Sequence, residues 1–460
     1  MSKMIFGPTF AEMQDPTQIP SDIRSRALAA KVADPLNPIN LYNITWKNAQ
    51  GRVNYIVLPH ELTGINTNVV VLYGKEFPTG SHKVGPTYSI AMEKQLAGEI
   101  EPGRDTLVWP STGNFGIGGA WVGPRLGYDS LVLLPEMMSQ ERFDKITSYG
   151  AKYIKTVGCE SNVKEIYDKT KELALADTKN KILNQFQEMG NYRFHYGVTG
   201  NSIIEAVKDL ADRGNGNGRV AAFVSAMGSS GTIAAGDRIK QQFSEAKTIG
   251  LEPIQCPTMY NNGYGGHDIQ GIGDKHVTWV HNVLNMDAIM CIDDLECKKG
   301  LQLLTEETGM KVLEKRFGIA REVLEPLSQI FGISGICNVL GAIKTAKYFG
   351  LGKRENVVTV ATDAIDRYPS VLEELTKTHG KMDEVEATVR AVSIFHKAKL
   401  DWIKEGTVDV KNSWLNLKYY TWVEQQGKTV DELNQQRDPE FWLAHQEKIS
   451  DIDKQILAHR

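Results

Sequence analysis

This chain of 460 residues lacks the sequence features of membrane-spanning, nucleic-acid-binding and secreted proteins. It contains no run of about 20 apolar residues, so we expect no membrane span. The near balance of 52 basic and 56 acidic residues gives a formal net charge of -4, which offers no electrostatic basis for binding nucleic acid or an anionic membrane. Residues 1–15 carry no apolar core bounded by a cleavage site, so a secretory signal is not expected.

Cysteine is scarce and is not arranged as a framework. The five cysteines form an odd set without any CxxC pair: Cys159, Cys256, Cys291, Cys297 and Cys337. This pattern predicts reduced thiols in the cytoplasm and argues against a disulfide scaffold or a zinc site. We therefore expect no metal centre, and we interpret the cysteines as core residues.

Short apolar segments alternate with helix-length amphipathic segments from about Asn68 onward. The candidate strands are Asn68–Tyr73, Thr106–Pro110, Ser130–Pro135, Lys152–Val157, Val220–Met227, Thr248–Glu252, Ala288–Ile292 and Val357–Thr362. Most lack polar alternation, as buried parallel strands do. The alternation predicts an α/β fold with mostly parallel sheets covered by helices on both faces.

The last segment, residues 381–460, differs in character because glycine becomes rare and tryptophans recur among charged residues. We expect an appended helical region that packs on the body or on a second subunit. Its tryptophans are interpreted as core or interface anchors: Trp402, Trp414, Trp422 and Trp442.

A lysine stands at one strand-to-helix junction. Lys83 ends the turn Pro78–Lys83 (PTGSHK), directly after the strand Asn68–Tyr73 and before a helix. A helix start disfavours a cation, so a lysine here is costly unless something uses it. When desolvated, its amine can form an imine with an aldehyde.

Three further junctions carry small, hydroxyl or acidic residues. Pro110–Gly119 presents a glycine- and hydroxyl-rich turn suited to a carboxylate or phosphate. Ser225–Thr232 forms a better phosphate cradle. It lacks the lysine of a P-loop and the GxGxxG of a dinucleotide fingerprint, so a small monophosphate fits better than a nucleotide. Val357–Asp363 ends in a residue able to hydrogen-bond. Such junctions can converge at one edge of a parallel sheet.

Taken together, these segments resemble the cysteine synthase and cystathionine β-synthase family, the tryptophan-synthase-like (fold type II) pyridoxal-phosphate enzymes. The resemblance runs in order from Val69 to Ser370. The matching motifs are Pro78–Lys83, Ser111–Gly116, Leu134–Arg142, Gln185–Gly200, Val224–Thr232, Gln270–Gly273, Gly332–Gly335 and Thr362–Tyr368. The resemblance implies two open, mostly parallel βαβ sheet domains with a C-terminal helical extension.

The resemblance also implies a role for each motif. Lys83 would be the Schiff-base lysine for pyridoxal 5'-phosphate, beside His82. The phosphate loop would be Gly228, Ser229, Ser230, Gly231 and Thr232. The substrate carboxylate would be held by Ser111, Thr112, Gly113 and Asn114, with help from Gln185, and Asn114 would also contact the pyridoxal hydroxyl. The implied division is a large cofactor domain of residues 1–95 and 200–380, a small substrate-loop domain of 96–199, and an extension of 381–460.

One departure from the family pattern concerns the residue that faces the pyridine nitrogen. The family's P-S-x-x-E-R-Y reads Thr362 to Tyr368 here, so the serine position falls on Asp363. A carboxylate there would favour the protonated ring nitrogen. A one-residue shift of the match would instead place Thr362 at the nitrogen, and both alternatives stay open.

The resemblance implies replacement or elimination at the β-carbon of a serine- or cysteine-like amino acid, through an aminoacrylate. A second hypothesis is a dehydratase or deaminase of the threonine or serine type. A non-catalytic scaffold is a third, against which Lys83 argues, and a nicotinamide-dependent dehydrogenase lacks its fingerprint. We expect a soluble cytoplasmic homodimer whose small-molecule partner is an amino acid.

Overall fold

The computed structural model describes residues 4–111, 113–159 and 161–460. Its strands form two sheets. The larger has seven strands in the order β1-β2-β10-β7-β8-β9-β11, and the smaller has four in the order β5-β4-β3-β6. The strands are β1 (Tyr55–Val57), β2 (Asn68–Tyr73), β3 (Thr106–Pro110), β4 (Asp129–Pro135), β5 (Lys152–Thr156), β6 (Asn180–Ile182), β7 (Val220–Ala226), β8 (Lys247–Pro253), β9 (Ala288–Ile292), β10 (Asn356–Ala361) and β11 (Ile403–Glu405).

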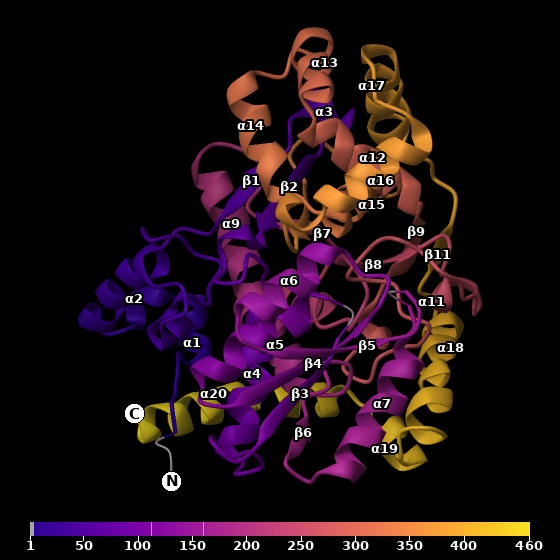
Figure 1. Ribbon diagram of the computed structural model, residues 1–460. Helices are drawn as coiled ribbons and strands as arrows, with labels where there is room; N and C mark the ends of the chain where they lie inside the picture. Colours follow the sequence, from indigo (N-terminus) through magenta and orange to yellow (C-terminus); the bar gives the residue numbers. More distant parts are fainter. Residues whose placement is uncertain (1–3, 112, 160) are drawn as a thin grey trace.

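Helices surround both sheets (Figure 1). The α-helices are α1 (Phe10–Gln14), α2 (Ser21–Ala33), α3 (His60–Thr63), α4 (Val84–Leu96), α5 (Asn114–Arg125), α6 (Gln140–Ser148), α7 (Val163–Ala176), α8 (Met189–Phe194), α9 (Gly200–Asp212), α10 (Ala235–Gln242), α11 (Thr258–Asn261), α12 (Asp294–Thr305), α13 (Glu307–Phe317), α14 (Arg321–Ile330), α15 (Ile333–Tyr348), α16 (Pro369–His379), α17 (Glu384–Arg390), α18 (Val408–Lys418), α19 (Val430–Gln435) and α20 (Pro439–His459). Shorter 3-10 turns are η1 (Pro16–Gln18), η2 (Pro38–Asn43), η3 (Gly74–Glu76), η5 (Thr232–Ala234), η6 (Val283–Asn285) and η7 (Ile365–Arg367), and π turns are η4 (His195–Thr199), η8 (Ala391–His396) and η9 (Tyr419–Val423).

The apolar runs expected to be strands are confirmed as β2, β3, β4, β5, β7, β8, β9 and β10, within two residues at each end. Three short strands were not predicted from the sequence: β1, β6 and β11. Each has three residues, all partly buried except the exposed Glu405 of β11. Such short segments carry too little periodicity to be recognised. β1 and β11 pair antiparallel at the two edges of the large sheet, whereas its five inner strands are parallel.

The large sheet is buried on both faces, which explains its continuous apolar runs. Along β2, Val70 and Leu72 belong to a core with α4, α5 and α9, while Val69 and Val71 belong to a second core with α12 and α15. Successive side chains point to opposite faces of a strand, so a strand covered on both sides must be apolar throughout. The α/β fold with mostly parallel sheets is therefore confirmed.

Among the described residues no single helix is long and apolar enough to cross a membrane. Only the bent pair α14 and α15, with an angle of 119° between them, meets the criteria of length and composition together.

The C-terminal region packs on the body of this chain. Its indole N–H groups are anchored to backbone carbonyls of the preceding loops: Trp414 Nε1 donates to Met259 and Trp422 Nε1 donates to Val277. The segment is mainly helical, as expected, and it also supplies β11 to the edge of the large sheet. Helix α20 runs back to the N-terminal segment, where Asp453 accepts hydrogen bonds from the amides of Phe10 and Ala11 (Figure 1).

We predict that Trp422→Ala lowers the free energy of unfolding by about 3–5 kcal/mol, because the indole is fully buried and its removal leaves a cavity. Urea unfolding followed by circular dichroism measures the change. Tyr420→Ala, two residues away and 60% exposed, is the matched control and should change stability by less than about 0.5 kcal/mol. Equal effects of the two substitutions would contradict an anchoring role for Trp422.

Candidate active site

Three neighbouring strands of the large sheet direct their carboxyl ends to one place. β10 lies between β2 and β7 and is parallel to both. The turn that follows β2 leads to Lys83, the loop after β7 is Gly228–Thr232, and Asp363 follows β10. Parallel strands leave their carboxyl ends at the same edge, so three segments far apart in sequence become neighbours.

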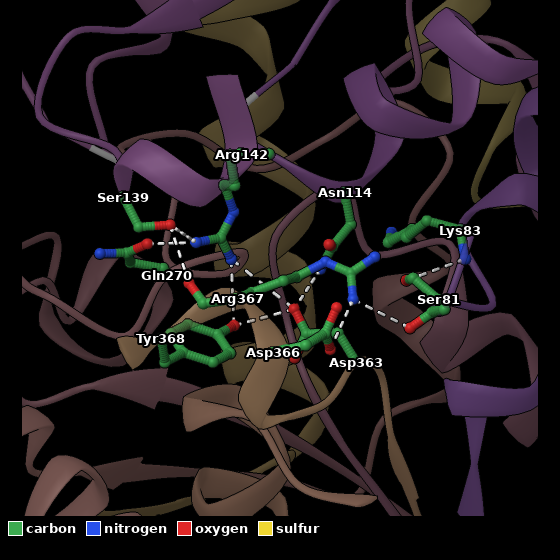
Figure 2. A network of polar contacts seen from close by, with 12 residues as sticks. Ser81, Lys83, Asn114, Ser139, Arg142, Gln270, Asp363, Asp366, Arg367 and Tyr368 are labelled. Carbon is green, nitrogen blue, oxygen red and sulfur yellow. Dashed lines mark hydrogen bonds and ion pairs between the residues drawn. The ribbon is translucent and has the colours of Figure 1, made fainter. Parts of the chain in front are cut away.

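Lys83 reaches the glycine- and serine-rich loop directly. Its Nζ donates to Ser229 Oγ at 2.9 Å, and the residue is 9% exposed. Ser81 Oγ accepts from the Lys83 amide, which fixes the backbone just before α4 (Figure 2). The lysine and the candidate phosphate loop therefore form one site.

His82 makes a second link between the same two segments. Its Nε2 lies 3.3 Å from Thr232 Oγ, and the ring is fully buried. Burial, with a smaller contribution from the charge of Lys83, lowers the pKa of His82 well below its usual value. The imidazole is therefore neutral at neutral pH, and it can act as a hydrogen-bonding group but not as a fixed charge.

The loop Gly228–Thr232 is shaped by its neighbours. Ser230 adopts a φ of 58°, in the left-handed region that most side chains avoid. A Cβ at Gly228 would lie 2.9 Å from the carbonyl oxygen of Gly271, and one at Gly231 would overlap the side-chain amide of Asn191. Asn191 in turn donates to Ser229 Oγ and to the carbonyl of Gln185, so Gln185 is tied to the site through Asn191.

The N-terminus of α5, which follows β3 of the smaller sheet, also borders the site. Ser111 Oγ accepts from the amides of Gly113 and Gly116, at 2.9 and 2.7 Å. A hydroxyl has one donor and two acceptor sites, so both acceptor sites of Ser111 are used and its proton is left to donate. Thr112, expected in this loop, lies outside the described residues.

Asp363, after β10, connects the large sheet to the start of α5 through Asn114. Its Oδ2 accepts from Asn114 Nδ2 at 2.7 Å and from the Tyr368 hydroxyl at 2.8 Å, and it lies 3.6 Å from Arg142 Nη2 (Figure 2). Thr362, the alternative at this position, instead offers its backbone carbonyl to the amide of His82. Of the two residues, the structure brings Asp363 to Asn114.

Arg142 on α6 contacts three segments around Asp363, although no motif in the sequence assigned it a role in the site. From α6 it donates to Ser139, to Gln270 and to Tyr368 (Figure 2). Beside this network lies a cavity of about 800 Å³, with Ser139 and Gln270 in its lining.

The structure also reveals which buried polar atoms at and near the site lack a hydrogen-bond partner. Within the described ranges, buried atoms without a hydrogen-bond partner include His82 Nδ1, Asn114 Oδ1, Ser334 Oγ, Asp363 Oδ1 and both carboxylate oxygens of Asp274. Asp274 directly follows the motif Gln270–Gly273, and an acidic residue in a glycine turn was the only signal in the sequence that could have singled it out. Search of the described residues finds no cluster of three or more His, Cys, Asp or Glu side chains able to hold a metal ion.

Known proteins share this architecture. Cysteine synthase B of Escherichia coli K12 is 30% identical to this chain over 294 residues. The aligned region covers 64% of this chain and 84% of the relative. Cysteine synthase of Staphylococcus aureus is 28% identical over 310 residues, or 66% of this chain and 90% of its own.

Solved structures agree at the level of fold. A hydrogen sulfide-producing enzyme of Fusobacterium nucleatum aligns over 74% of this chain and 92% of its own, with a TM-score of 0.56 and 25% identity. Cysteine synthase of Entamoeba histolytica aligns over 74% and 92% with a TM-score of 0.59 and 22% identity.

The family model described as "Pyridoxal-phosphate dependent enzyme" matches residues 58–314, the stretch that contains the turn to Lys83, the loop at the start of α5 and the loop Gly228–Thr232. This chain therefore belongs to the family of pyridoxal-phosphate-dependent enzymes.

Proposed function

We propose that the enzyme replaces or eliminates a substituent on the β-carbon of a serine- or cysteine-like amino acid, with Lys83 as the residue that binds pyridoxal phosphate covalently. The observation that supports the proposal most directly is the 2.9 Å hydrogen bond from Lys83 Nζ to Ser229 Oγ, because an amine beside a glycine- and serine-rich loop is suited to form an imine with an aldehyde whose phosphate that loop would bind. The cysteine synthases among the relatives support chemistry at the β-carbon.

The residues of the site fit this cofactor. Buried polar atoms without a partner cost free energy, so those at His82, Asn114, Ser334 and Asp363 are suited to a ligand that meets them. The amides of Gly228–Thr232 would hold its phosphate, Asn114 its ring hydroxyl and Asp363 its ring nitrogen. When bound, the cofactor supplies an electron sink for charge that develops at the substrate Cα.

The chain's own groups divide the remaining work. Lys83, released from the cofactor when substrate binds, would take the proton from Cα and later return one. The amides at the N-terminus of α5 and the free donor of Ser111 would bind the substrate carboxylate, with Thr112, Gly113 and Gln185. The Arg142 network would hold the two domains around the substrate and exclude water.

The sequence also suggests properties that stay predictions. These are a homodimer, a cytoplasmic location and the division into residues 1–95 with 200–380, 96–199 and 381–460. Sedimentation of the purified enzyme measures the first directly.

Lys83→Ala should abolish the covalent link to the cofactor, the associated visible absorbance and turnover. Borohydride reduction followed by peptide mapping locates the linked lysine in the wild type. Lys83→Arg is the matched control, because it keeps the charge but cannot form the link, and it should be equally inactive. A reduced adduct on another lysine would remove Lys83 from its role.

Asp363→Ser should slow exchange of the substrate Cα proton for deuterium by ~10-fold or more, while the cofactor still binds to Lys83. A hydroxyl stabilises the protonated ring nitrogen less than a carboxylate does, so the electron sink weakens. Asp366→Ser is the control: it lies on the same turn with a side chain 53% exposed. Proton nuclear magnetic resonance follows the exchange, and an unchanged rate in Asp363→Ser would show that Asp363 does not govern the ring.

Gly231→Ala should weaken cofactor binding at least ~10-fold, because the new methyl group displaces Asn191 and with it Ser229. Titration of the cofactor-free enzyme with pyridoxal phosphate measures the affinity. Gly352→Ala, where a Cβ meets only the carboxylate of Glu355 at 3.6 Å, is the control and should bind normally. Wild-type affinity in Gly231→Ala would separate this loop from the phosphate.

A further inference from the structure

A buried carboxyl group beside the candidate site has no structural partner. Asp274 is 5% exposed, and neither of its carboxylate oxygens has a hydrogen-bond partner among the residues that the structure describes. Glu252 offers a contrast within the same fold. It is 4% exposed, but its two oxygens accept from the amides of Met259 and Tyr260, so its carboxyl holds a loop in place.

The turn that carries Asp274 lies against the phosphate cradle. The amide of Gly273 donates to the carbonyl of Met227, one residue before Gly228. The carbonyl of Gly271 packs so closely against Gly228 that it leaves no room for a Cβ there. Thr278 Oγ1 donates to the carbonyl of Ser229, the residue that also binds Lys83. Asp274 is therefore held by its backbone next to the loop that Lys83 contacts.

The surroundings of Asp274 raise the pKa of its carboxyl group into the neutral range. Burial raises the pKa of Asp274 to about 7, and the charge of Lys83 acts in the opposite direction. Two other titratable groups interact electrostatically with the Asp274 carboxyl: Tyr167 on α7 and Cys256 before α11. Burial, together with Asp274, raises the pKa of each, so both stay neutral at neutral pH. Of Lys83, Tyr167 and Cys256, Lys83 is thus the group that can carry a positive charge opposite the Asp274 carboxylate.

The buried Asp274 carboxyl lowers the stability of the fold, and no hydrogen bond with a described residue offsets that loss. A buried carboxyl without partners is destabilising in its charged form. Within the described ranges the Asp274 side chain makes no hydrogen bond of the kind by which Glu252 anchors its loop. A pKa near the working pH is what an acid–base group requires, because both protonation states are then accessible.

We propose that Asp274 is a second acid–base group of the site, acting on the β-substituent while Lys83 acts on Cα. This role rests on the function proposed above. Lys83 takes the Cα proton, and the bonding pair left at Cα forms the Cα–Cβ double bond as the bond from Cβ to the substituent breaks. The departing group keeps that bond's electron pair and takes the proton of Asp274, leaving as a neutral molecule.

The second half of a replacement reverses these transfers. The Asp274 carboxylate takes the proton of an incoming thiol, whose sulfur forms the new bond to Cβ. Lys83 returns its proton to Cα. Protons and electron pairs balance over the cycle, and no oxidant or reductant is consumed.

The leaving group provides the test. Hydroxide is a poor leaving group and needs a proton, whereas chloride leaves without one. Asp274→Asn should therefore reduce the rate of substituent loss from serine by ~10²–10⁴-fold, the usual range for a general acid, and that from β-chloroalanine by less than ~10-fold. The cofactor-bound variant should keep the wild-type visible spectrum, which shows that the site is intact.

The control is Glu252→Gln. Burial also raises the pKa of Glu252 to about 7, although its oxygens are satisfied by the protein, so the variant should show the same leaving-group dependence as the wild type. Equal losses on serine and β-chloroalanine in Asp274→Asn would overturn the proposal. A wild-type enzyme inactive on every β-substituted amino acid would overturn the proposed function itself, and the role of Asp274 with it.

A second measurement uses the cofactor-free protein and no turnover. A carboxyl whose folded-state pKa lies above its unfolded value of 3.8 favours folding when protonated, so its contribution falls as pH rises from about 4 through about 7. Thermal unfolding should therefore show Asp274→Asn gaining several degrees relative to wild type between pH 5 and pH 8. An equal loss of stability at both pH values would assign Asp274 a structural role and contradict the proposal.

Discussion

The parallel pairing of β10 between β2 and β7 is the interaction on which the site depends. β10 matches β2 residue by residue from Asn356 opposite Asn68 to Ala361 opposite Tyr73. With the strands in this register, the turn to Lys83, the loop at Ser229 and the carboxylate of Asp363 leave the sheet at one edge. A register shift of one residue would reverse the faces of β2 and move its valines out of their two cores. The apolar core therefore sets the positions of the polar groups as well as the stability of the sheet.

The site is built from groups that the fold does not satisfy. Among the residues that the structure describes, Asp363 receives two hydrogen bonds on one oxygen and none on the other, and the buried ring of His82 has one nitrogen without a partner. Such groups lower stability in the protein alone, which a close-packed apolar core on each face of the large sheet can tolerate. Polar atoms left unpaired at one place are what a small, polar ligand requires.

The C-terminal region explains how a long loop near the site keeps its shape. The segment between β8 and β9 contains Asp274 and contacts the loop Gly228–Thr232. Its carbonyls accept hydrogen bonds from Trp414 and Trp422, and from the buried amine of Lys418, which donates to the carbonyls of Trp279 and His281. Burial lowers the pKa of Lys418 well below its usual value, so this tie costs free energy. The extension therefore acts as a support for the loop that carries part of the site.

The sequence by itself determined the eight longer strands, the lysine turn and the glycine-rich loops, because continuous apolar runs and turn residues act locally along the chain. It also led to the family through motifs that keep their order. It could not place Arg142 and Tyr368 around Asp363, choose between Asp363 and Thr362, or reveal Asp274 as unpaired. Those properties depend on contacts between residues up to about 250 positions apart, as the bond from Asn114 to Asp363 illustrates with a separation of 249. Hydrogen-bond partners and burial are set by packing between distant segments, so only the tertiary structure decided them.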